Sequence, residues 1–183
     1  MNKINMSFDK EIFREFIGRT INAFLHDSFA FVNSSSQVVQ LNFENDIYYL
    51  YSSVEPLDSY GFVDDVAVWE WTTKKYPIID KKTFITTPIN EKIKEIHLVQ
   101  ENQQLYKNNK QIYDVWVTRG IIFILESGRE ISFEKAVWFS EDIYINKGYN
   151  LINTFQSTDE FREGWDKSEG YRGECIRNIE VIK

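Results

Sequence analysis

The apolar residues of this chain recur mostly at every second position, in short runs separated by turn-forming residues. The run from Val66 to Trp71 is typical, because Trp69 and Trp71 fall on one side of it and Glu70 falls on the other. A period of two is the period of a β-strand that buries one of its faces. The chain is therefore expected to fold mainly as β-sheet.

Similar runs predict strands along the whole chain. Asn, Asp, Ser and Gly occupy the gaps between them, and these are the residues that turns favour. Because strand follows strand without an intervening helix, an antiparallel meander is expected rather than a doubly wound parallel sheet. The other predicted strands cover residues 21–25, 29–32, 38–43, 47–51, 93–99, 112–118, 121–126, 130–133, 143–145 and 175–182.

Two segments depart from this period and predict helices. Residues 8–18 gather their phenylalanine and isoleucine side chains on one helical face, after a capping Ser7. Ser157 or Thr158 caps a second, short helix over residues 158–165. The sequence thus predicts an α+β fold, in which a mainly antiparallel meander carries an N-terminal helix and a short helix in the C-terminal region.

The length of 183 residues fits a single domain, residues 1–183. Residues 72–92 contain two of the three prolines and predict an irregular connection inside it. Residues 101–110 are polar and predict a loop or hairpin tip, with its turn at Asn108-Asn109.

Several features bear on the compartment. Asp9 and Glu11 interrupt any apolar run near the N-terminus, so no secretory signal is expected there. No run approaches the roughly 18 apolar residues of a membrane span. Cys175 is the one cysteine, which excludes a disulfide scaffold. We expect a cytoplasmic protein that does not bind membranes.

Catalytic motifs are not found in the sequence. It has no glycine-rich phosphate loop, no nucleophile elbow and no metal-ligand spacing, and its histidines, His26 and His97, stand far apart. The sequence therefore predicts no catalytic residues, no metal ligands and no cofactor. A non-enzymatic protein is favoured, although abundant carboxylates leave a hydrolase open.

Charge is distributed unevenly along the chain. The net charge is −7 and the pI is near 5.0, which argues against nucleic-acid binding. The 54 residues from Thr20 to Thr73 contain no Lys or Arg, yet they contain eight acids and many Tyr and Trp. Acids on one side of a sheet would attract a basic partner. In the alternative arrangement, the acids are scattered over loops and the aromatic residues fill the core.

The sequence therefore predicts an acidic, aromatic-rich face that binds a basic protein. Its candidate partner-binding residues are Asp58, Asp64, Asp65, Trp69, Glu70 and Trp71. The alternative is that the same tryptophans line a cleft for a small ligand or a carbohydrate, in a binding module or a hydrolase. The oligomeric state is left open by the sequence.

One part of the chain resembles a known class of proteins. The stretch from Val115 to Ile131 has a strand–turn–strand–turn–strand pattern, and the stretch from Phe139 to Ile143 follows it. Together they are similar to segments of small bacterial cytoplasmic α+β proteins, such as the immunity proteins of polymorphic-toxin systems. The resemblance implies a non-enzymatic inhibitor that covers a basic toxin domain, and it carries over no site residues.

Overall fold

The computed structural model of the chain describes residues 1–27, 34–59, 62–77, 79, 83–136 and 140–183. For four residues within strands it describes the backbone alone: Asn2, Ser59, Phe62 and Asp64. The strand predicted over residues 29–32 lies outside the described part of the chain.

Eleven strands in this part of the chain join into one continuous sheet. Its order is β3-β10-β9-β8-β7-β2-β4-β5-β6, with β1 added on β8 and β11 added on β7. Only the β1–β8 pair is parallel among these strands, so the prediction of a mainly antiparallel sheet is confirmed. The strands are β1 (Asn2–Met6), β2 (Thr20–Asp27), β3 (Ser34–Ser36), β4 (Val38–Phe43), β5 (Ile47–Ser59), β6 (Phe62–Thr72), β7 (Phe84–Lys107), β8 (Lys110–Leu125), β9 (Glu130–Lys135), β10 (Asp142–Gly148) and β11 (Tyr171–Ile182).

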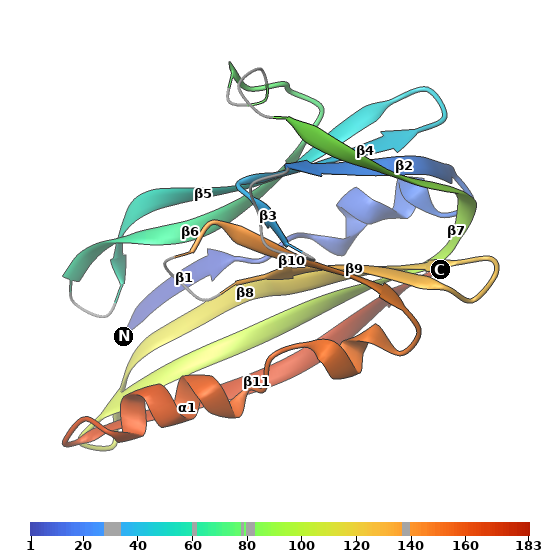
Figure 1. The fold of residues 1–183 in the computed structure, drawn as a ribbon. Helices are drawn as coiled ribbons and strands as arrows, with labels where there is room; N and C mark the ends of the chain where they lie inside the picture. Colours follow the sequence, from blue (N-terminus) through green and yellow to red (C-terminus); the bar gives the residue numbers. More distant parts are fainter. Residues whose placement is uncertain (28–33, 60–61, 78, 80–82, 137–139) are drawn as a thin grey trace.

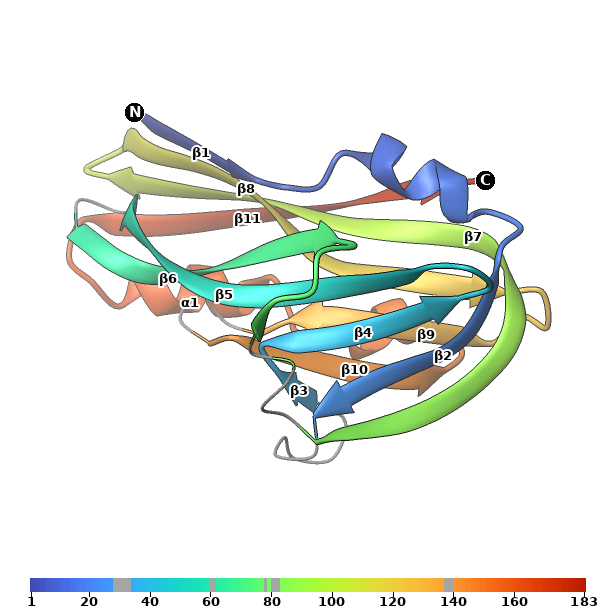
Figure 2. The ribbon, with the colours of Figure 1, turned by 90° about the horizontal axis from the view of Figure 1, so that it is seen from above.

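The 24-residue strand β7 carries the sheet from one layer into another. Residues 84–92 of β7 pair with β2, whereas residues 96–107 pair with β11 on one side and with β8 on the other. Figures 1 and 2 show the result: β2, β4, β5 and β6 lie as one layer over the layer that contains β8, β7 and β11.

The core lies between these two layers. Its buried side chains come from both of them, and they include Phe24, Leu41, Leu50, Trp69, Ile96, Leu98, Phe123 and Phe133. Burying one large apolar side chain contributes roughly 1.5–3 kcal/mol, so this cluster is the main source of stability. Alternation accounts for most of these residues, because each strand turns one face toward the core. In β2 a register shift between Ile21 and Ala23 breaks the alternation, and Phe24 reaches the core as a result.

The N-terminal helix predicted over residues 8–18 is wrong as an α-helix. A 3-10 helix, η1, spans Lys10–Phe16 instead. With three residues per turn, Phe13 and Phe16 fall on the same side, and both are fully buried. Ile12, which an α-helix would place on the buried face, is 42% exposed.

The helix predicted over residues 158–165 is present as α1 (Asp159–Asp166), after a 3-10 helix, η3 (Leu151–Thr154). α1 runs beside β11, as Figure 1 shows. Gly173 of β11 permits this approach, because a Cβ there would lie 3.2 Å from the Arg162 Cα. The helices found among the described residues are all too short or too polar to cross a membrane.

Two segments predicted as irregular belong to β7. Residues 84–92 of the predicted connection 72–92 form strand, and so do residues 101–107 of the predicted loop 101–110. The turn at Asn108-Asn109 is confirmed, and both residues have positive φ, at 49° and 64°. The polar residues stay in the strand because their side chains bond to one another; for example, Gln104 Nε2 donates to Asn102 Oδ1 at 2.6 Å.

A buried polar cluster fastens the chain before α1 to the sheet. Arg177 Nη2 donates to Glu101 Oε1 and to the Gln156 carbonyl oxygen, each at 2.6 Å. The Gln156 N–H donates to Glu134 Oε1 at 2.9 Å, and Arg119 pairs with the same oxygen at 3.3 Å. Each buried glutamate is thus matched by one arginine, as a charge inside a protein requires.

Gly120→Ala is expected to lower the free energy of unfolding by about 1–3 kcal/mol, because an added Cβ overpacks the site. That Cβ would overlap the Phe155 ring and lie 2.7 Å from the Phe133 carbonyl oxygen. Gly164→Ala is the control, because nothing lies within 4 Å of a Cβ there. In α1 that change should raise stability by about 0.5–1 kcal/mol. Urea denaturation measures both, and a similar effect of the two changes would contradict the close packing at Gly120.

Candidate functional site

A cavity of about 320 Å³ opens on β5 and β6. It also includes residues from the link between β3 and β4, the turn after β6 and the chain before β10. We call it the acidic pocket, and its lining residues are Gln37, Tyr51, Ser52, Ser53, Glu55, Glu70, Tyr76 and Glu141.

Strand alternation places two lining side chains on the outer face of the upper layer. In the antiparallel β5–β6 pair, Tyr51 stands opposite Glu70. Leu50 and Trp69, which precede them, both point into the core. Because successive side chains of a strand point to opposite faces, Tyr51 and Glu70 face away from the core.

The Glu70 carboxylate is held in place by the turn that follows β6. Tyr76 Oη donates to Glu70 and lies 3.1 Å and 3.0 Å from its two oxygens. The Tyr76 N–H donates to Tyr51 Oη at 2.9 Å. The two rings pack edge to face, with their centres 4.7 Å apart. Burial raises the pKa of Tyr51, so this phenol stays protonated at neutral pH.

The Glu141 carboxylate is held from the opposite wall. Gln37 Nε2 donates to Glu141 Oε2 at 2.7 Å, and the Val54 N–H lies 3.4 Å from Glu141 Oε1. Val54 lies on β5 beyond the residues that pair with β4, so its N–H turns to a side chain instead. Two of the pocket's carboxylates are therefore oriented before any ligand arrives.

The pocket is strongly negative. Glu55, Glu70 and Glu141 contribute three carboxylates, and among the lining residues that the structure describes none is Lys or Arg. A nearby cation is Lys74, whose Nζ lies 4.7 Å from the centre of the Tyr76 ring. Ionised carboxylates only accept hydrogen bonds, so the pocket suits a ligand that brings donors and positive charge, such as an ammonium or guanidinium group.

No set of three or more His, Cys, Asp or Glu side chains suited to a metal ion occurs among the described residues.

The six residues predicted to bind a partner lie in different environments in the structure. Glu70 lines the acidic pocket. Trp69 is buried in the core and Trp71, which is partly buried, packs against it, because both alternate with Glu70 along β6. Asp58 and Asp65 are exposed toward the far end of the β5–β6 hairpin. The side chain of Asp64 lies outside the described part of the chain.

Sequence reasoning missed most of the pocket. Glu55 was visible as one of the acids in the stretch without Lys or Arg, but nothing set it apart from the others. Tyr76 lies just beyond that stretch, in a segment predicted to be an irregular connection. Gln37 and Glu141 are 104 residues apart, and no local pattern joins them.

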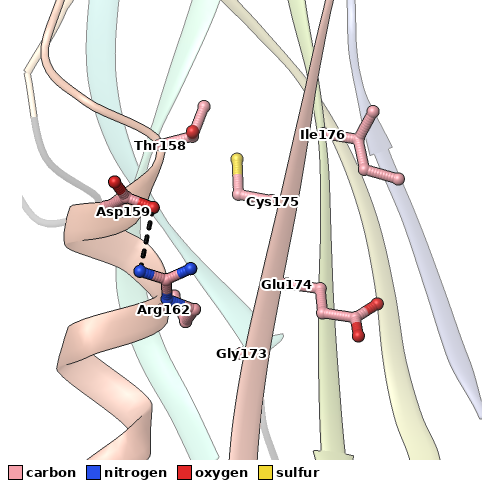
Figure 3. Close-up of a pocket in the computed structure, with 7 residues that line it drawn as sticks. All are labelled: Thr158, Asp159, Arg162, Gly173, Glu174, Cys175 and Ile176. Atoms are coloured by element: carbon pink, nitrogen blue, oxygen red, sulfur yellow. Dashed lines mark ion pairs between the residues drawn. The ribbon is translucent and has the colours of Figure 1, made fainter.

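A second cavity, of about 220 Å³, lies between α1 and β11 (Figure 3). The side chain of Cys175 projects from β11 toward the side on which Thr158 and Asp159 lie. Burial raises the pKa of the Cys175 thiol to about 12, so it stays protonated at neutral pH. A protonated thiol is a poor nucleophile, so Cys175 is not activated for covalent chemistry in this cavity.

Comparison with protein-family models found no match to this chain, and neither did comparison with curated proteins or with solved structures.

Proposed function

We propose that this chain is a non-enzymatic binding protein, an immunity-type inhibitor that occludes a basic site on a partner protein such as a toxin domain. In this proposal the acidic pocket receives a Lys or Arg side chain of the partner. The observation that carries it is the convergence of Glu55, Glu70 and Glu141 on one cavity, whose described lining contains no Lys or Arg. We place this activity in the cytoplasm.

The orientation of the carboxylates supports this function. Glu70 is held by Tyr76, and Glu141 is held by Gln37, so little side-chain freedom remains to be lost on binding. Charge-assisted hydrogen bonds to such groups are roughly twice as strong as neutral ones. A Lys or Arg side chain that enters the pocket would therefore meet two carboxylates that are already oriented.

The wider surface supports the same partner chemistry. Asp58 and Asp65 extend the negative charge along the β5–β6 hairpin. A negative field of this kind speeds the encounter with a basic protein and selects against acidic ones. Trp69 and Trp71 are left out as contact residues, because they fill the core. The alternative of a ligand cleft lined by these two tryptophans loses its support for the same reason.

Glu70→Lys is expected to weaken the complex about thirtyfold or more, because the partner's cation would lose its anion and meet a like charge. The partner is captured from a lysate of the source cells with the wild-type protein, purified and titrated calorimetrically. Glu163→Lys is the matched control, since it makes the same charge change on α1, which lies beside β11 and away from the acidic pocket.

Two outcomes of that titration would refute the proposal. One is equal binding of the partner by the wild type and the Glu70→Lys variant. The other is equal weakening by Glu70→Lys and Glu163→Lys, which would show that net charge matters and the pocket does not. Both variants are first compared with the wild type in urea denaturation, so that a folding defect is not read as lost binding.

A further inference from the structure

Beyond the core, β1, β8, β7 and β11 continue side by side as a four-stranded surface. Trp116 of β8 lies near its middle, opposite Asn5 of β1 and Asn102 of β7. Its side chain is 43% exposed, whereas Trp69 in the core is 6% exposed. We call this surface the Trp116 face, and it includes Lys3, Asn5, Asn102, Gln104, Asp114, Trp116, Arg172, Glu174 and Ile176.

The opposite side of the same strands is closed by packing. Leu105, Tyr113 and Val115 are buried there, with Trp165 of α1 and Tyr171 packed against them. Trp116 alternates with Val115 along β8, so it points away from this cluster. Its exposed indole is therefore not needed to attach the helix or to fill the interior of the protein.

A ladder of hydrogen bonds fixes the polar groups next to Trp116. Tyr106 Oη donates to Gln104 Oε1 at 2.7 Å, and Gln104 Nε2 donates to Asn102 Oδ1 at 2.6 Å. Asn102 Nδ2 then donates to Asp114 Oδ1 at 2.6 Å. An amide has two donor hydrogens and a carboxylate accepts about four bonds, so Gln104 and Asp114 keep capacity for a ligand.

The Trp116 face is balanced in charge, unlike the acidic pocket. Arg172 pairs with Glu174, and its guanidinium lies 4.4 Å from the centre of the Tyr106 ring. Lys3 of β1 stands in register with Asp114 of β8. Two positive and two negative side chains thus balance each other on this face. Such a surface does not select for an ion, so it suits an uncharged ligand.

We propose that the Trp116 face binds a neutral oligosaccharide. A sugar ring has an apolar side of C–H groups, which matches the exposed indole, and a rim of hydroxyls, which matches fixed donors and acceptors. In this site one ring stacks on Trp116, and its hydroxyls bond to Asp114 and Gln104. Asn102 is a positioning residue, because it is 5% exposed and orients both of these side chains.

The test begins with an array of short, neutral glucans, galactans, mannans and chitooligosaccharides. The wild type is expected to retain at least one of them, and that oligosaccharide is then titrated in solution. Trp116→Ala should weaken binding about tenfold or more, whereas Trp116→Phe should keep part of it. Tyr149→Ala is the matched control, since Tyr149 is 65% exposed on the chain after β10 and lies outside the Trp116 face.

Three outcomes would overturn this inference. The first is that the wild type retains no neutral oligosaccharide. The second is equal binding by the wild type and the Trp116→Ala variant. The third is that Trp116→Ala weakens binding of the protein partner while no glycan binding is detected, which would make this face a protein interface. Glu70→Lys should leave glycan binding unchanged. The proposal for this site and the proposal for the acidic pocket can therefore be refuted independently of each other.

Discussion

Glu101→Leu is expected to lower the free energy of unfolding by about 3–5 kcal/mol, because it leaves a buried arginine without its anion. Arg177 Nε and Nη2 lie 3.1 Å and 2.6 Å from Glu101 Oε1, and Gln103 Nε2 lies 2.9 Å from Glu101 Oε2. The side chains of Glu101 and Arg177 are 4% and 18% exposed. Water therefore cannot easily replace the lost carboxylate.

A double variant separates the ion pair from the other contacts of Glu101. Glu101→Leu with Arg177→Met removes both charges, so it should recover much of the stability that Glu101→Leu loses. Urea denaturation of the wild type, both single variants and the double variant gives the coupling energy. If the two single losses simply added in the double variant, the pair would not be a buried, coupled unit.

Lys135→Met is expected to raise stability at pH 6, by on the order of 4 kcal/mol. Burial, and secondarily the charge of Arg119, lower the pKa of Lys135 to about 7. Its Nζ donates to the Ala67 carbonyl oxygen of β6 and lies 5.8 Å from the centre of the Trp69 ring. Met keeps the length of the side chain but removes the charge from this buried place.

The effect of Lys135→Met on stability depends on pH, because Lys135 binds its proton differently in the folded and unfolded chains. Between about pH 7 and the ordinary lysine pKa of about 10.5, unfolded chains bind this proton and folded chains do not. Stability of the wild type therefore rises with pH through that window, by about 1.4 kcal/mol per pH unit relative to the variant. The advantage of Lys135→Met is full below pH 7 and shrinks above it. Urea denaturation from pH 6 to pH 10 measures it, and an advantage that stays constant with pH would contradict a depressed pKa.

The strands and their faces could be predicted because alternation is a local property. The run from Val66 to Trp71 showed which side chains share a face, and the structure places Trp69 in the core and Glu70 outside it as that run implied. The same observation also weakened the predicted site, because tryptophans and acids on opposite faces of one strand cannot meet one partner together.

The long strand β7 was predicted only in its middle, over residues 93–99, and its full length could not be predicted from its own residues. Its second half carries Gln100 to Gln104, a polar run that ordinarily indicates a loop. These side chains remain in the sheet because β8 supplies partners for them, for example Thr118 Oγ1, which donates to Gln100 Oε1 at 2.8 Å. Partners that lie elsewhere in the chain leave no local signal, and tertiary contacts overrode propensity here.

The acidic pocket was predictable only in part, for the same reason. Glu70 was found from the lack of Lys and Arg around it, which is a feature of composition along one stretch. Glu141 joins it because β10 folds back onto β3, and Gln37 follows β3 directly. Such a meeting depends on the strand order of the sheet, which the sequence does not specify.

The most direct test of the acidic pocket is hydrogen–deuterium exchange on the purified complex with its partner. The amides of residues 51–55 and 70–76, which surround Glu55, Glu70 and Tyr76, are predicted to exchange more slowly in the complex than in the free protein. The amides of α1 should be unchanged. Protection confined to other parts of the chain, with unchanged exchange in residues 51–55 and 70–76, would contradict the claim that this pocket receives the partner's basic side chain.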